Sequence, residues 1–166
     1  MLLRSPGLPR SPWLPSSARL RRRVPALLLA ATLWLWPVDA PHAVARPYLA
    51  PATPYSAGHR GVDLSAPEGT AVLAPADGVV RFAGWVVDRP VLSVAHAGGV
   101  ISSYEPVESQ LLEGDVVRRG DVIGTLLPDH CRTPCLHLGV RIDGEYVSPL
   151  LFLGGQPRAV LLPVRR

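Results

Sequence analysis

Three residues of this sequence have the side chains and the spacing that a metal site requires. His59 and Asp63 lie four residues apart in HRGVD, so on an extended segment, where the side-chain period is two, they share a face. His137 lies in the apolar run TPCLHLGV (residues 133–140) and could supply a third ligand. Imidazole and carboxylate groups both bind zinc, and three protein ligands with an open fourth position form a catalytic zinc site. Taken alone, HxxxD is more simply explained by a surface histidine and a turn aspartate, so the hypothesis depends on the rest of the chain.

The two cysteines lie close to the last of these residues. Cys131 and Cys135 are the only cysteines of the chain and are separated by RTP. In an oxidising compartment, a local disulfide that closes this turn is the favoured state, and two unpaired thiols packed as small apolar residues are the alternative. Cys135 shares a face with His137. As a free thiolate it could take the fourth zinc position and convert an open site into a closed, structural one.

The elements that must position these residues are β-strands. From Gly61 onwards, short apolar runs such as GVVRFAGWVV (78–87) and CLHLGVRI (135–142) alternate with turn signals such as ADG, RRGD and DG. Helical periodicity is absent over any window of useful length. The pattern predicts an all-β fold, a compact sandwich or barrel.

One pair of segments relates this fold to a known architecture. APADGVV (74–80) and EGDVVRRGDVIGTL (113–126) resemble the two halves of lipoyl- and biotinyl-type domains. Those domains attach their cofactor to a lysine, and this chain contains no lysine. A covalent carrier is therefore excluded, and the relation to the barrel-sandwich architecture is what remains.

The basic charge of the chain is confined to its N-terminal segment. The formal net charge is +4, but residues 1–45 hold six arginines and one acid, Asp39, and the remainder carries one more acidic than basic residue. A nucleic-acid interface on the folded domain is therefore not expected.

Residues 1–45 have the layout of an export signal. A cluster of arginines at residues 19–23 precedes an apolar stretch (24–38), and AVA (43–45) offers a cleavage site. The apolar stretch is shorter than the roughly 20 residues that span a bilayer, so cleavage is favoured over an uncleaved anchor, which is the alternative. We therefore expect an exported protein that is extracellular, associated with the cell wall or anchored to the membrane by this segment alone. Residues 46–57 are expected to form a Pro/Ala-rich linker, and residues 154–166 a C-terminal extension.

Four segments together resemble one enzyme family. HRGVDLSAPEGTAVLAPADGVVRFAG, VISSYEPV, EGDVVRRGDVIGTL and CLHLGVRIDGEYVSPLLFL are similar, in order and spacing, to the lysostaphin-like (LytM-type) zinc endopeptidases that cut peptidoglycan. The resemblance implies a domain over residues 58–153 with a two-sheet antiparallel β-sandwich fold. It also implies Zn²⁺ held by His59, Asp63 and His137, and peptidoglycan as the partner.

Two positions depart from the family's pattern. The family has a histidine at each of two places that are occupied here by Pro106 and Cys135. Both of the family's histidines transfer protons during catalysis. A positioned general base typically contributes about a hundred- to ten-thousand-fold in rate, so activity requires a substitute. The candidates are Glu105, His130 on the loop before the last metal ligand, and Tyr104, which falls where the family has a groove tyrosine.

Two functions follow from this resemblance and these departures. The first is an exported zinc metalloendopeptidase that hydrolyses peptide bonds of peptidoglycan with an altered proton-transfer apparatus. The second is a catalytically impaired family member that binds peptidoglycan or regulates another wall hydrolase.

Overall fold

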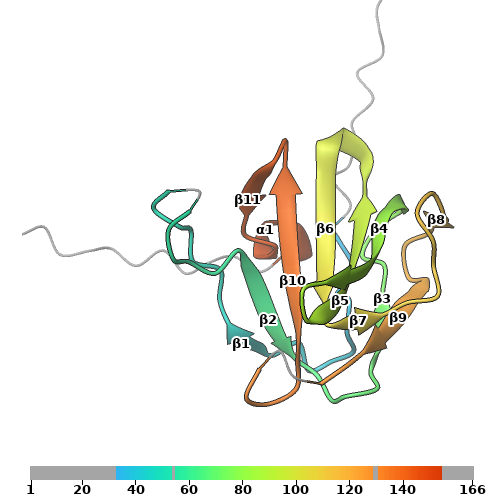
Figure 1. Ribbon diagram of the computed structural model, residues 1–166, viewed down its shortest axis with the longest axis horizontal. Coiled ribbons are helices and arrows are strands. Elements are labelled where there is room, and N and C mark those ends of the chain that lie inside the picture. Colours follow the sequence, from blue (N-terminus) through green and yellow to red (C-terminus); the bar gives the residue numbers. More distant parts are fainter. Residues whose placement is uncertain (1–32, 54, 129–130, 155–166) are drawn as a thin grey trace, which may run out of the picture. The chain divides into compact units, whose positions relative to one another are not determined.

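Antiparallel strands are the main regular structure of the described chain, which comprises residues 33–53, 55–128 and 131–154 of a computed structural model (Figure 1). The strands are β1 (Val44–Arg46), β2 (Gly61–Ser65), β3 (Ala71–Leu73), β4 (Gly78–Val86), β5 (Arg89–Ala95), β6 (Val100–Glu105), β7 (Val107–Glu108), β8 (Val116–Val117), β9 (Val122–Leu126), β10 (Cys135–Ile142) and β11 (Glu145–Val147). A 3₁₀ turn (Ala97–Gly99) and one short helix, α1 (Leu150–Leu153), are the helical elements of these residues.

The strands form two antiparallel sheets. The larger sheet has eight strands in the order β1-β2-β10-β6-β5-β4-β8, with β11 paired to β10, and the smaller has the order β3-β9-β7. The expected all-β fold with two antiparallel sheets is confirmed. Strand β10 lies between β2 and β6, so segments from three distant parts of the sequence are neighbours in the sheet (Figure 1).

The core lies on one face of the larger sheet. Val62 and Leu64 of β2 and Leu136 and Leu138 of β10 are fully buried, and they pack with residues of the smaller sheet, including Ile123. Because side chains alternate along a strand, the residues between these apolar ones face the other way. This alternation leaves the second face of β2, β10 and β6 for polar side chains.

The segment before β2 belongs to the same folded unit. Val38 is only 2% exposed within the core, and Trp34 and Trp36 pack against it. Strand β1 pairs with β2, and Leu49 exchanges two backbone hydrogen bonds with His59. The first part of the expected linker (residues 46–57) thus pairs along the sheet edge, as Pro-rich composition allows, and the domain boundaries stay a prediction.

Other expectations at the two ends of the chain stay predictions. Most of the expected export signal (residues 1–32) and the C-terminal residues 155–166 lie outside the described residues. Within the described residues, no helix has the length and apolar character needed to cross a membrane.

Removal of residues 1–45 should destabilise the domain relative to removal of residues 1–32. The longer deletion takes away Val38, whose burial alone is worth about 1.5–3 kcal/mol, together with most of β1. Urea unfolding followed by circular dichroism measures the difference between the two truncated chains. Identical unfolding midpoints would show that residues 33–45 do not support the fold.

Candidate metal centre

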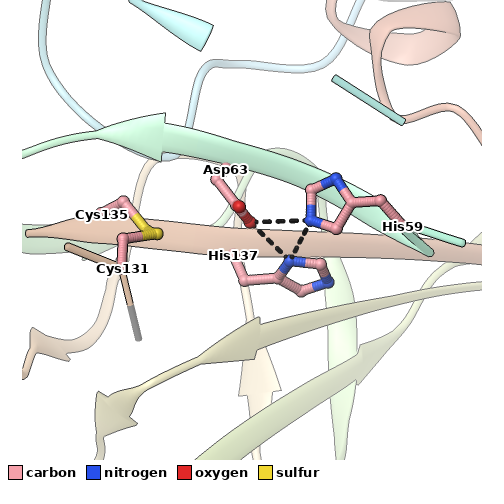
Figure 2. Close-up of a disulfide and its surroundings, with 5 residues drawn as sticks. All are labelled: His59, Asp63, Cys131, Cys135 and His137. Atoms are coloured by element: carbon pink, nitrogen blue, oxygen red, sulfur yellow. Dashed lines mark hydrogen bonds and ion pairs between the residues drawn. A yellow bond between two sulfur atoms is a disulfide. The ribbon is translucent and has the colours of Figure 1, made fainter. Parts of the chain in front are cut away.

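Three side chains point toward one another on the polar face of the large sheet: Asp63 of β2, His137 of β10 and His59, which precedes β2 (Figure 2). Nε2 of His59 lies 2.9 Å from Oδ1 of Asp63 and 3.1 Å from Nδ1 of His137. Nδ1 of His137 lies 2.7 Å from the same Asp63 oxygen. The structure thus brings together all three residues that the sequence suggests as metal ligands.

Strand register accounts for this convergence. His137 of β10 is directly opposite Asp63 of β2, and His59 precedes β2 at its backbone bridge to Leu49. Gly61 leaves space for the imidazole, since a Cβ at this position would lie 2.6 Å from Nε2 of His137 and 2.3 Å from the carbonyl oxygen of Leu138. The sequence GHRGVD therefore supplies His59, Asp63 and the glycine that leaves space for His137.

A backbone carbonyl group fixes the orientation of the His59 ring. Its Nδ1 lies 2.7 Å from the carbonyl oxygen of Pro47, which can only accept a hydrogen bond, so Nδ1 carries the hydrogen. In the neutral ring the lone pair is then on Nε2, the atom that faces Asp63 and His137. A backbone carbonyl in this role is the usual outer support of a metal-binding histidine.

The three converging atoms fit a zinc ion. For neutral rings, His59 Nε2 and Asp63 Oδ1 are both acceptors and face each other at 2.9 Å without a hydrogen between them, so they need a proton or a cation. Zinc bonds of about 2.0–2.1 Å in a tetrahedron place ligand atoms about 3.3 Å apart, slightly more than the separations found here. Both His59 and Asp63 are buried, whereas the His137 side chain is 12% exposed, which leaves one open side.

Cys131 and Cys135 are joined by a disulfide in this structure. Cys135 is buried and is on the same face of β10 as His137, two residues away (Figure 2). While it is bonded to Cys131, its sulfur is not available as a thiolate ligand. The disulfide form therefore keeps the fourth position of the metal site open.

A groove of about 870 Å³ extends from His137 across the polar face of the sheet. Glu105 lines this groove and is directly opposite His137 in the pairing of β6 with β10. Residues directly opposite each other have Cβ atoms about 4.5–5.5 Å apart, so the carboxylate is close to the metal ligands. The other charged and aromatic lining residues used below are Arg60, Arg81, Glu113, Arg141 and Tyr146.

Tyr104 does not line the groove, and its expected role as a donor there is wrong. It alternates with Glu105 on β6, so its side chain is on the core face, where it is fully buried. Its hydroxyl lies 2.7 Å from the Ser102 hydroxyl, which lies 2.7 Å from Nε2 of His96. Burial raises the pKa of the Tyr104 phenol and lowers the pKa of His96. This chain of polar groups satisfies buried side chains behind the sheet.

The remaining candidates differ in what the structure says of them. Pro106 is buried, like Tyr104, and does not face the groove. His130 lies outside the described residues. Sequence reasoning missed Arg60 and assigned no chemistry to Arg141 or Tyr146, although the odd-numbered positions of β10 after His137 mark Arg141 as a residue of the groove face.

Comparison with known proteins adds a family to this geometry. The family model described as Peptidase family M23 matches residues 57–149, more than half of the chain. The chain belongs to peptidase family M23. The resemblance to lysostaphin-like peptidases is confirmed, and the matched range contains the whole candidate metal centre. The fold agrees as well, because the catalytic domain of lysostaphin from Staphylococcus simulans superimposes with a TM-score of 0.60 at 22% identity over 68% of this chain and 92% of that domain.

Relatives of this M23 domain include an uncharacterized protein, a peptidase and a hydrolase activator. The uncharacterized protein Rv2891 of Mycobacterium tuberculosis is 41% identical over 74% of this chain and 52% of its own length. The DD-carboxypeptidase/endopeptidase Mpg of Neisseria meningitidis is 37% identical over 55% of this chain and 22% of its own length. The murein hydrolase activator NlpD of Salmonella dublin is 28% identical over 72% and 31%. The chain thus spans about half the length of the first of these relatives and less of the others.

Zinc should stabilise the domain through Asp63. At a free zinc concentration about 100 times the Kd, binding adds about 2.7 kcal/mol to the free energy of unfolding. Asp63→Asn removes the anionic ligand while preserving shape, so this zinc-dependent gain should vanish. Thermal unfolding with and without zinc measures it. Asp88→Asn is the matched control, because the Asp88 side chain is 64% exposed and pairs with Arg89 away from the site. An undiminished gain in Asp63→Asn would contradict the assignment.

Proposed function

We propose that this chain is an exported zinc metallopeptidase that hydrolyses peptide bonds of peptidoglycan. The observation that carries the proposal is the convergence of His59, Asp63 and His137 at the side of a groove that also holds Glu105. A triad of two imidazoles and one carboxylate with one open side has the ligand number and type of a catalytic zinc site. Membership of peptidase family M23 supports the reaction class.

The residues of the chain divide the chemistry between them. Zinc bound to the triad would supply a Lewis acid that polarises the scissile carbonyl and lowers the pKa of a water molecule. Pro47 and Gly61 orient the two histidines for this ion. Glu105, opposite His137, takes the proton of the attacking water and returns it to the leaving amine, as a general base and then a general acid. Glu105 thereby replaces the histidines that the family has at Pro106 and Cys135.

Export is part of the same proposal. The arginine cluster at residues 19–23 and the apolar residues after it support it, with residues 33–45 retained because Val38 lies in the core. The disulfide between Cys131 and Cys135 supports it as well, since such bonds persist in oxidising compartments. Peptidoglycan is accessible only to an exported protein.

The second candidate is a non-catalytic member that holds peptidoglycan or regulates another wall hydrolase. The replacement of both family histidines by Pro106 and the disulfide-bonded Cys135 favours it. NlpD, a relative named as a hydrolase activator, shows that M23-like chains occur with that role. In this case the groove binds the peptide and Glu105 transfers no proton.

Glu105→Gln should lower the rate of hydrolysis by about a hundred- to ten-thousand-fold without loss of zinc, because the amide cannot accept the proton. The measurement is the release of new amino termini from purified peptidoglycan by the full chain, together with its zinc content. Glu108→Gln is the matched control, since Glu108 is exposed on β7, the next strand along the chain, and does not line this groove.

Two other outcomes decide against parts of the proposal. If the parent chain binds one zinc ion and releases no amino termini at any pH, it is a binding or regulatory protein. If Glu105→Gln and the parent cut at equal rates, the protein is a peptidase whose general base is another group.

A further inference from the structure

The Arg141 side chain lines the groove and, among the described residues, takes part in no ion pair. Its Nε atom is buried and is the one side-chain nitrogen or oxygen of these residues found to be buried without a hydrogen-bond partner. A guanidinium stays protonated in proteins, so Arg141 keeps its positive charge in the groove. Because Nε is closed off from the groove, a ligand there is bound through the Nη groups.

A second guanidinium of the groove lies over the same aromatic ring as Arg141. Arg60 and Arg141 both lie over the ring of Tyr146, with their Cζ atoms 6.0 and 5.5 Å from its centroid. Arg60 also donates a hydrogen bond from Nη2 to the carbonyl oxygen of Ser56, which holds its side chain in place. Two cations around one aromatic ring repel each other, and an anion bound by both relieves that repulsion. The planar fork of a guanidinium matches a carboxylate with two parallel hydrogen bonds.

The last metal ligand and Arg141 lie on one face of the same strand. His137, Gly139 and Arg141 follow one another on that face of β10, and residues four apart on a strand are about 13 Å from each other. A Cβ at Gly139 would lie 2.9 Å from Oγ of Ser103 and 3.8 Å from Cε1 of Tyr146, so the missing side chain makes room for these two groove residues. An extended peptide of about four residues spans the distance from His137 to Arg141.

We infer that Arg141 and Arg60 form a carboxylate subsite that selects peptides with a free carboxylate within about four residues of the bond at the metal centre. The ligand class is a peptide whose terminal or side-chain carboxylate accepts hydrogen bonds from the Nη groups of Arg141. This inference rests on the proposed function for the position of the scissile bond. The subsite itself depends only on the two arginines, Tyr146 and Gly139.

The test compares stem peptides from peptidoglycan in three forms: all carboxylates free, only the C-terminal carboxylate converted to an amide, and all carboxylates amidated. Isothermal titration of the full, zinc-free chain measures binding without turnover. The free form should bind at least tenfold more tightly than the fully amidated form, and the singly amidated form shows which carboxylate is read. Arg141→Gln should weaken the free form to the level of the amidated one and leave the amidated form unchanged. Arg141→Lys, which keeps the charge and loses the fork, should fall between them.

Arg118→Gln is the matched control, since Arg118 is exposed and does not line this groove, and it should bind like the parent. Equal affinity of the parent for the free and fully amidated peptides would overturn the inference, and this comparison needs no variant to fold. An equal loss for both peptides in Arg141→Gln would also overturn it. Hydrolysis of these peptides by the zinc-loaded chain is scored separately. Preferential binding of the free form without cleavage would support the carboxylate subsite and contradict the peptidase activity. Cleavage and binding that are equal for both forms would support the peptidase activity and contradict the subsite.

Discussion

The pairing of β10 with β2 is the constraint on which the metal centre depends. It sets His137 opposite Asp63 and, at the same time, places four apolar side chains of these strands in the core. A slip by one residue would turn His137 inward and expose its apolar neighbours. Burial of each such side chain is worth about 1.5–3 kcal/mol, whereas a hydrogen bond within the triad contributes about 0.5–1.5 kcal/mol net. The core therefore fixes the register, and the geometry of the triad is a consequence of it.

The strand period explains which parts of the site could be predicted from the sequence. The positions of Asp63 and His137 follow from alternation, because each of them stands between two buried apolar residues of its strand. The same rule places Glu105 on the groove face and Tyr104 in the core. Tyr104 was assigned to the groove from family resemblance, against the parity of its strand, and that prediction was wrong. The alternation along β10 also predicts that Arg141 faces the groove. The contacts of Tyr146 with Arg141 and Arg60 could not be predicted from the sequence, because they depend on how β11 pairs with β10.

Contacts made by the backbone could not be predicted in this way. The carbonyl group of Pro47 orients His59, yet nothing in the type of residue 47 encodes that contact. It arises because Leu49 pairs with His59 and thereby folds the chain back beside β2. Composition alone predicts a linker over residues 46–57, because proline and alanine do not indicate a β-strand. The first part of this segment instead completes the support of a proposed metal ligand, and the core residue Val38 anchors the segment that leads into it.

Charge within the groove differs from charge over the domain as a whole. Residues 46–166 carry one more acid than base, which gives no reason to expect an anionic ligand. The groove, in contrast, is lined by three arginines and two glutamates, and a zinc ion beside Asp63 would add one further positive charge. Because charges in a cleft with low-dielectric walls act over short distances with little screening, the local balance governs what binds there. A peptide with a free carboxylate is then drawn to the arginine end of the groove, and its neutral backbone is left to lie across Gly139 toward Glu105 and the metal ligands.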